Sequence, residues 1–173
     1  NMTIVGDAND YVGKGMTGGR LIVHPQTGIA YKTHEGSIIG NTCLYGATGG
    51  ELFAAGQAGE RFGVRNSGAV TVVEGMGDNG CEYMTGGIVV CLGKTGVNFA
   101  AGMTGGFAYI LDEKGDMNQR MNHECAQALP IEYAAYQSHL KSLIFQHYAA
   151  TGSERAKTML DDFDTWLPKF LLV

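Results

Sequence analysis

The sequence lacks any apolar run near the roughly 18 residues that a membrane-spanning helix requires, and its first residues lack the charged and apolar regions of a signal peptide. Basic residues are also few, since 12 lysines and arginines stand against 17 aspartates and glutamates, for a net charge of −5. Nucleic-acid-binding domains usually carry a basic face. The sequence therefore predicts a cytoplasmic protein that binds neither membrane nor nucleic acid.

The cysteine patterns of metal sites and disulfide scaffolds are missing as well. No C-x-x-C pair of the kind that zinc and iron–sulfur sites favour is present, because the four cysteines lie 38, 10 and 34 residues apart, at Cys43, Cys81, Cys91 and Cys125. A chain of 173 residues can bury a core without disulfides. The five histidines share no metal-ligand spacing, and we expect His139 and His147 on a helix surface or in packing. We therefore expect reduced structural thiols and no metal site.

Glycine, in contrast, is abundant. The chain has 27 glycines, and 26 of them lie between Gly6 and Gly115, whereas an average protein of this length has roughly half as many. Between these glycines stand short β-branched runs, such as residues 70–73 and 88–92, which predict strands. Residues 1–115 therefore form the strand-rich part of the domain.

The last third of the chain has a different pattern. Residues 131–150 place apolar side chains three and four positions apart, as a helix does, with Tyr136, Leu140, Leu143 and Ile144 on the inner face. Gly152 then predicts a helix end, and Ser153 the N-cap of a second helix. Residues 116–173 are therefore expected to be a helical segment of the same domain.

A short phrase, a hydroxyl residue followed by small residues, recurs five times and predicts the fold. Its hydroxyl residues are 31, 19, 18 and 19 positions apart, and the long interval has an excess of about 12 residues that we place in a loop over residues 24–35. A period near 19 accommodates three short strands and three corners, which is one coil of a β-solenoid. No six-residue register of the left-handed type is present. We expect an all-β core, a right-handed parallel β-helix with coils of about 19 residues, followed by C-terminal helices that pack on it or cap it.

The glycines of the phrase have an expected structural role. Each stands directly after a hydroxyl residue and before a strand, where we expect a corner that needs positive φ. These expected corner glycines are Gly18, Gly49, Gly68, Gly86 and Gly105.

Several strings resemble catalytic or nucleotide-binding motifs. Two G-x-G-x-x-G strings, residues 13–18 and 75–80, look like a dinucleotide fingerprint, but each runs into another glycine phrase and a strand, whereas a fingerprint must open a helix. Gly93-Lys94-Thr95 resembles the end of a phosphate loop but has no glycine at the required position upstream. Charged residues near the corners are expected to be solvated or paired between coils, at Glu51, Glu60, Arg61, Arg65, Asp78 and Glu82. No Ser/His or Cys/His couple accompanies them, so we expect no catalytic, cofactor-binding or metal-binding residue.

Longer strings carry a resemblance to a known family. They are GDANDYVGKG at residues 6–15, IGNTCLYGATGG at 39–50, GERFGVRNSG at 59–68, GDNGCEYMTGG at 77–87 and GKTGVNF at 93–99. Together they resemble the C-terminal glycine-repeat (GXGXG) domain of the large subunit of glutamate synthase, most closely its bacterial NADPH-linked branch. The resemblance covers the whole chain.

This resemblance implies an enzyme whose chemistry lies in other domains. A glutaminase domain with an N-terminal cysteine nucleophile and a synthase domain with FMN and an iron–sulfur cluster make glutamate from glutamine and 2-oxoglutarate. A small NADPH-oxidising subunit supplies the electrons. The present domain would be a non-catalytic scaffold that packs against the glutaminase and synthase domains, with further coils upstream of Gly6. Two alternatives stay open, namely a glycine-pattern subunit of another redox complex such as formylmethanofuran dehydrogenase, and a self-contained enzyme or nucleotide-binding module.

Overall fold

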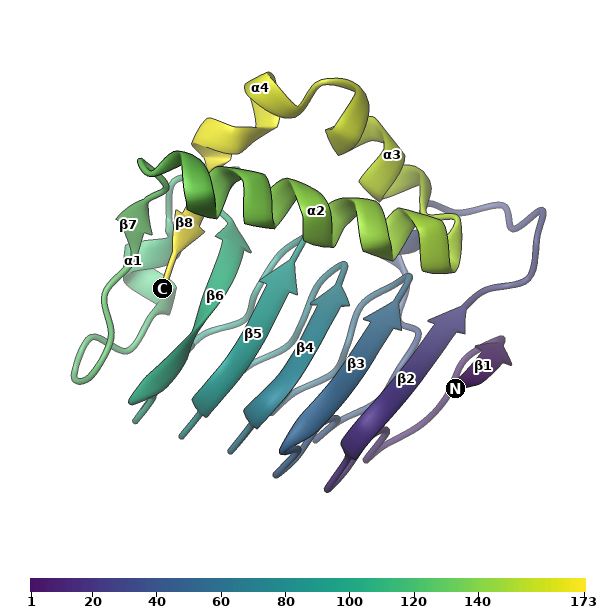
Figure 1. The fold of residues 1–173 in the computed structure, drawn as a ribbon, viewed down its shortest axis with the longest axis horizontal. Coiled ribbons are helices and arrows are strands. Elements are labelled where there is room, and N and C mark those ends of the chain that lie inside the picture. The colour runs from purple at the N-terminus through teal and green to yellow at the C-terminus, as the bar shows by residue number, and fades with distance from the viewer.

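Every recurrence of the glycine phrase begins a strand. The computed structural model describes residues 1–173, and its strands form one sheet in which the six parallel strands stack in chain order (Figure 1). The parallel strands are β1 (Met2–Val5), β2 (Thr17–His24), β3 (Gly49–Ala54), β4 (Ser67–Val73), β5 (Thr85–Cys91) and β6 (Gly105–Leu111). In Figure 1 the connections pass behind the sheet and each next strand lies to the left, which is a right-handed path. The expected right-handed parallel β-helix is confirmed.

Only one wall of each coil is a regular strand, so the expectation of three strands per coil is wrong. The segment before each strand contains residues with positive φ at alternate positions, as at Asn79, Cys81 and Tyr83 with φ of 61°, 56° and 55°. Such residues lie outside the β region, which prevents an extended ladder. Neighbouring coils are joined there by single backbone hydrogen bonds instead, for example from Cys81 N to the Phe62 oxygen at 2.8 Å.

The positive φ expected at the first glycine of the phrase lies one residue later. Gly87 has a φ of 84°, whereas Gly86 is not in the left-handed region. Gly86 meets a different constraint, because a Cβ there would lie 2.3 Å from the carbonyl oxygen of Ser67 on the preceding coil. The same close approach to the preceding backbone occurs at three other phrase glycines, Gly49, Gly68 and Gly105, but Gly18 faces open space. Four of the five phrase glycines therefore allow neighbouring coils to stack closely. The positive φ belongs to the glycine that follows, at Gly19, Gly50, Gly87 and Gly106, and in the phrase of Gly68 neither Gly68 nor Ala69 has it.

Both faces of the sheet are buried. In β5, Val89 and Cys91 point into the apolar cluster inside the solenoid, whereas Val90 and Leu92, the residue directly after the strand, point into a second cluster under the helices. Successive strand side chains alternate between faces, so one strand supplies both clusters. This explains why the strands read as continuous apolar runs rather than as alternating ones.

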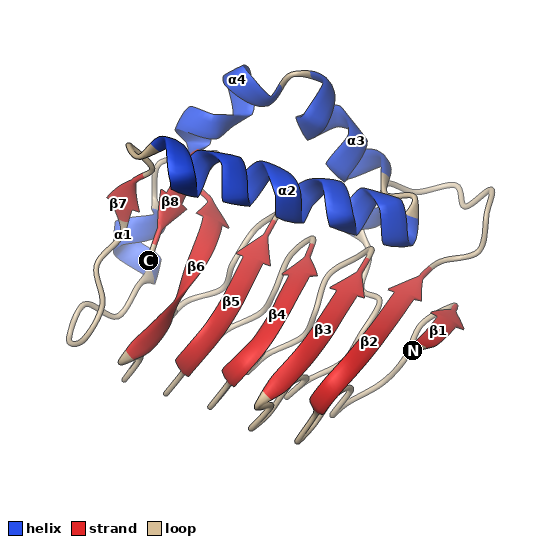
Figure 2. Ribbon diagram, viewed as in Figure 1, coloured by secondary structure: helices blue, strands red, loops and turns tan.

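From residue 134 on, the helices of the C-terminal part cover the outer face of the sheet (Figure 2), whereas Met117 of its first helix packs into the cluster inside the solenoid. The helices of this part are α1 (Met117–Arg120), α2 (Ala134–Thr151), α3 (Glu154–Asp161) and α4 (Phe163–Trp166), and short 3-10 turns occupy Thr33–Glu35 and Leu167–Lys169. The strands β8 (Phe170–Leu172) and β7 (Leu129–Pro130) extend the sheet beyond β6, with β8 antiparallel to both. None of the helices has the length and apolar content to cross a membrane.

The expected helix signals are confirmed at the junction of α2 and α3. Gly152 ends α2 in the left-handed conformation with a φ of 69°, and the Ser153 side chain accepts a hydrogen bond from Ala156 N at the start of α3. Within α2, Leu140 is buried against the sheet as expected, as are Leu143 and Ile144. The inward placement of Tyr136 is wrong. Its side chain is 37% exposed near the start of α2, and its ring makes a T-shaped contact with the Phe107 ring, with the two ring centroids 5.9 Å apart.

Candidate functional site

The nucleotide-like glycine strings do not open helices. Residues 13–18 lead into β2, residues 75–80 leave β4 and turn toward β5, and Gly93-Lys94-Thr95 follows β5 in a loop. A pyrophosphate is held by the free N–H groups of a helix N-terminus after such a string. This geometry is therefore missing from all three strings.

The positions of the four cysteines indicate a structural rather than a catalytic role for the buried thiols. Cys43, Cys81 and Cys91 are buried, and Cys125 is exposed. Burial raises the pKa of the Cys43 thiol to about 11 and that of Cys91 to about 12, and it raises the pKa of Cys81 as well. Because a thiolate is the reactive form, these three side chains are protonated and inert near neutral pH. No three His, Cys, Asp or Glu side chains gather as a metal-ligand set.

This burial makes a direct prediction for thiol chemistry. At pH 8 a maleimide or disulfide reagent is expected to modify Cys125 quickly and the three buried cysteines only after unfolding. At Cys43 a pKa raised from 9.0 to about 11 lowers the thiolate fraction about a hundredfold, in addition to the steric protection. Time-resolved mass spectrometry with and without urea measures the four rates, and Cys125→Ser is the control. Two or more thiols reacting quickly in the folded chain would contradict the placement.

The main buried polar cluster joins three separate parts of the chain. The carboxylate of Glu74, directly after β4, lies 2.9 Å from Nε2 of His147 on α2, and both side chains are fully buried. Thr33 lies near the end of residues 24–35, here called the inserted loop, which follow β2, and it donates its hydroxyl to the other carboxylate oxygen of Glu74. The second imidazole nitrogen of His147 has no partner. One carboxylate thus links a coil, a helix and the inserted loop.

The sequence carries only part of the signal for this cluster. His147 continues the inner stripe of α2 beyond Leu140 and Ile144 at helical spacing, and Glu74 continues the apolar run of β4. Each position could be recognised as inward-facing. Their pairing spans 73 residues, and no local pattern reveals it. The expectation that His147 serves in packing is confirmed, but its carboxylate partner was missed.

A carboxylate–imidazole couple is part of many general-base systems, but this one has neither a nucleophile beside the imidazole nor access for a substrate. The Thr33 hydroxyl donates to the carboxylate and not to the imidazole, so no nucleophile is activated. Neither Glu74 nor His147 is accessible to a substrate. The arrangement can fix α2 and the inserted loop to the solenoid.

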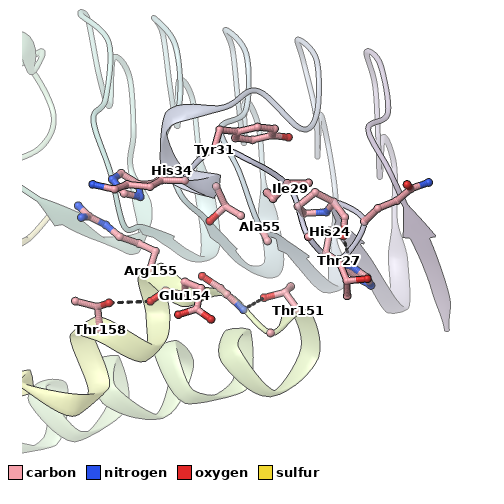
Figure 3. A pocket seen from close by; sticks show the side chains of 17 residues that line it. His24, Thr27, Ile29, Tyr31, His34, Ala55, Thr151, Glu154, Arg155 and Thr158 are labelled. Carbon is pink, nitrogen blue, oxygen red and sulfur yellow. Dashed lines mark hydrogen bonds between the residues drawn. The ribbon is translucent and has the colours of Figure 1, made fainter.

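A cleft of about 630 Å³ lies beside this cluster (Figure 3). The inserted loop lines one side, including His24, Tyr31 and His34, and the residues around the α2–α3 junction line the other. Burial, followed by the nearby Arg155 guanidinium, lowers the pKa of His34. Arg155 itself is occupied, since it donates to the Leu92 oxygen and to the Glu113 carboxylate. The cleft therefore has polar walls, and of its lysine and arginine side chains, Lys32 and Arg155, the arginine is already paired.

The charged corner residues divide into paired and unpaired ones. Glu51 pairs with Arg20 on the neighbouring coil at 2.5 Å, and Asp78 accepts a hydrogen bond from Val97 N on the next coil at 2.8 Å, as expected for contacts between coils. Arg61 and Arg65 take part in none of the ion pairs of the structure. They line a hollow of about 550 Å³, here called the corner groove, whose other walls are Tyr11, Lys14, Thr42, Tyr45, Val64, Asn79, Glu82 and Tyr83.

Comparison with known proteins agrees with the recurring glycine phrase of the coils. The family model described as "GXGXG motif" matches residues 1–173. The chain is 55% identical over 98% of its length to the ferredoxin-dependent glutamate synthase of Pyropia yezoensis, and 53% identical over 98% to ferredoxin-dependent glutamate synthase 1 of Arabidopsis thaliana. It is 52% identical over 99% to the glutamate synthase [NADH] of Schizosaccharomyces pombe.

These relatives are much longer than the chain, which spans 11%, 10% and 8% of their respective lengths. Their names specify ferredoxin or NADH, so the expected bacterial NADPH-linked branch has no support from them. With one strand per recurrence of the glycine phrase, and with a match over its whole length, the chain belongs to the GXGXG motif family and corresponds to one segment of the much longer glutamate synthases.

Proposed function

We propose that this chain is a non-catalytic scaffold domain of a glutamate synthase that makes glutamate from glutamine and 2-oxoglutarate. The observation that carries the proposal is identity of 52–55% over nearly the whole chain to a segment that is about a tenth of each relative. The alternative, a subunit of another redox complex such as formylmethanofuran dehydrogenase, rests on the glycine pattern alone. Identity over whole coils favours the glutamate synthase.

Within the parent enzyme, the domain is proposed to pack against the glutaminase and synthase domains. The outer face of α2 supports this, because Tyr133, just before the helix, is 73% exposed and Phe145 is 59% exposed. Lys141 is the only lysine, arginine or acidic residue among the 18 residues of α2. Exposed aromatic side chains on a helix with so little charge are typical of a surface that another protein surface covers.

The helices and coils are proposed to be one domain, with coils over residues 1–115 and the helical segment over 116–173. A shared apolar cluster supports this, since Phe53 and Val90 of the strands lie in the same cluster as Leu140 and Met159 of the helices. Met117 also joins the cluster inside the solenoid. Neither part could bury its apolar surface without the other.

The residues of this chain do not fit the cofactors of such an enzyme. An iron–sulfur cluster needs several thiolates close together, but three of the four thiols here are buried and protonated and the fourth is exposed. The glycine strings offer no helix N-terminus for the FMN phosphate. FMN and the cluster are therefore proposed to lie in other domains of the parent. An NADPH-oxidising small subunit is not part of the proposal, and the reductant is proposed to be ferredoxin or a nicotinamide nucleotide.

Two measurements test the scaffold proposal. The purified chain is expected to be colourless, with no stoichiometric flavin or iron and with neither glutaminase nor NAD(P)H oxidase activity, by visible spectroscopy, metal analysis and assay. Deleting the same residues from the full-length enzyme is expected to lower glutamate formation by at least roughly tenfold, because domains that are no longer held in position lose productive orientation. Assays of glutaminase activity and flavin content in the deletion variant are the control. One flavin per isolated chain, or full coupled activity with normal assembly after deletion, would contradict the scaffold role.

A further inference from the structure

The corner groove is cationic on an acidic chain. Three cationic side chains, Lys14, Arg61 and Arg65, line it against the single carboxylate of Glu82, although the chain as a whole has a net charge of −5. The ammonium of Lys14 lies over the Tyr11 ring at 5.3 Å, and neither arginine has an ion-pair partner. Unpaired like charges that line one hollow repel each other. The groove therefore favours an anionic occupant.

The backbone beneath these side chains has an unusual conformation for their residue types. Arg61 and Arg65 have φ of 56° and 55°, and Tyr11 and Tyr83 have φ of 63° and 55°. The left-handed region is unfavourable for residues that carry a Cβ. In three of the four other coils the position equivalent to Arg65 is glycine, at Gly15, Gly46 and Gly102, all with positive φ, and in the fourth it is Tyr83. Glycine would relieve this conformational strain at Arg65. The arginine therefore costs folding free energy that the fold does not require.

The aromatic side chains of the groove are available for contact. Tyr11 is 55% exposed and Tyr83 is 54% exposed. Tyrosine and arginine are the residue types that contribute most of the binding energy in protein interfaces. The groove offers both types on a rigid backbone, because each coil is hydrogen-bonded to the next, as from Arg65 N to the Glu82 oxygen at 2.9 Å.

We propose that the corner groove is the docking site of an extended, acidic segment in the remainder of the parent chain. This assignment rests on the proposed function. The groove extends from the coil of Lys14 to the coil of Tyr83, three coil intervals of roughly 4.8 Å, which matches about four extended residues. Carboxylates at intervals along such a segment would pair with the three cations in turn. The parent supplies the segment, because the relatives are about ten times longer than this chain.

Carbodiimide cross-linking of the full-length enzyme tests the proposal. The reagent joins the Lys14 amine to an adjacent carboxylate as an amide with loss of water, and peptide mapping identifies the partner. We expect Lys14 to be joined to an aspartate or glutamate outside residues 1–173 of the same polypeptide. In Arg61→Gly/Arg65→Gly the yield is expected to fall by roughly tenfold, and the rate of hydroxyl-radical oxidation of Tyr83 is expected to rise.

The glycine variant separates docking from folding, since glycine is favoured at both of these φ values and the melting temperature is expected not to fall. Lys157→Ala, an exposed cation on α3 outside the groove, is the matched control and is expected to leave the Lys14 cross-link unchanged. Three results would overturn the proposal. They are cross-links confined to residues 1–173, a cross-linked partner on a second polypeptide, and a cross-link yield that the double substitution leaves unchanged. If one of these results is found and the full-length enzyme still makes glutamate, only the docking proposal is wrong. If the intact full-length enzyme does not make glutamate, the proposed glutamate synthase function is wrong.

Discussion

Replacing Gly105 by valine is expected to destabilise the solenoid by at least about 3 kcal/mol, the upper end of the usual range for overpacking. A Cβ at Gly105 would stand 2.1 Å from the carbonyl oxygen of Thr85 and 2.8 Å from its carbonyl carbon. Both atoms belong to the backbone of the preceding coil, and no side-chain rotation can make room. The two coils would have to separate, which would weaken the ladder between β5 and β6. Urea denaturation followed by circular dichroism measures the change in free energy of unfolding.

The chain contains its own control for this experiment. Gly18 has the same place in the phrase as Gly105, but a Cβ there meets nothing within 4 Å, and its φ lies outside the left-handed region. Gly18→Val is therefore expected to change the free energy of unfolding by less than about 1 kcal/mol, as for most surface substitutions. Equal losses in the two variants would mean that valine is disfavoured by the strand backbone, and the close approach between coils would not be the cause.

Replacing His147 by alanine is expected to cost about 3–5 kcal/mol, because it leaves the Glu74 carboxylate without its imidazole partner in a fully buried site. Glu74→Ala is expected to cost a similar amount, since it removes the partner of both His147 and Thr33. The double variant Glu74→Leu/His147→Leu fills the site with apolar groups of similar size. It is expected to recover most of the loss, because a buried polar pair and an apolar pair of similar volume are often close in stability.

The double-mutant cycle is measured by chemical denaturation, and Ser138→Ala on the exposed side of α2 is the control. Hydrogen exchange adds a second measurement. In His147→Ala we expect faster exchange in α2 and also in the inserted loop, whose Thr33 shares the carboxylate. Single losses below about 1 kcal/mol, typical of an ordinary surface hydrogen bond, would show that the cluster does not hold the helix to the solenoid.

Much of the fold was predictable because its signals are local and repeated. Thr48, Ser67, Thr85 and Thr104 are about 19 residues apart, and strands begin within one residue of each of them. Helix signals of the same local kind, Gly152 and Ser153, mark the end of α2 and the start of α3. Because the same spacing occurs in several coils, a misassigned strand in one coil is corrected by comparison with the others.

The candidate sites were less predictable. Arg61 and Arg65 could be placed near a corner, but their side chains come together with Lys14 only because the coils of about 19 residues stack. The inserted loop shifts Lys14 by 12 residues relative to the regular period, so spacing alone does not align it with the arginines. The pairing of Glu74 with His147 likewise depends on where α2 crosses the sheet.

The amino-acid sequence by itself determined the solenoid, its period, the start of each strand and the helical C-terminal part, because hydrophobic spacing, glycine and capping residues act over a few neighbouring positions. Only the tertiary structure decided what the phrase glycines do. The conformational need was expected at Gly86, but it lies at Gly87, and Gly86 is required by the carbonyl oxygen of Ser67 on another coil. It also decided that a buried carboxylate holds the helix and the inserted loop, and that Arg65 has a conformation that suits glycine. The physical reason is that such features depend on atoms brought together by stacking, and their free energies belong to contacts between coils rather than to any short segment of chain.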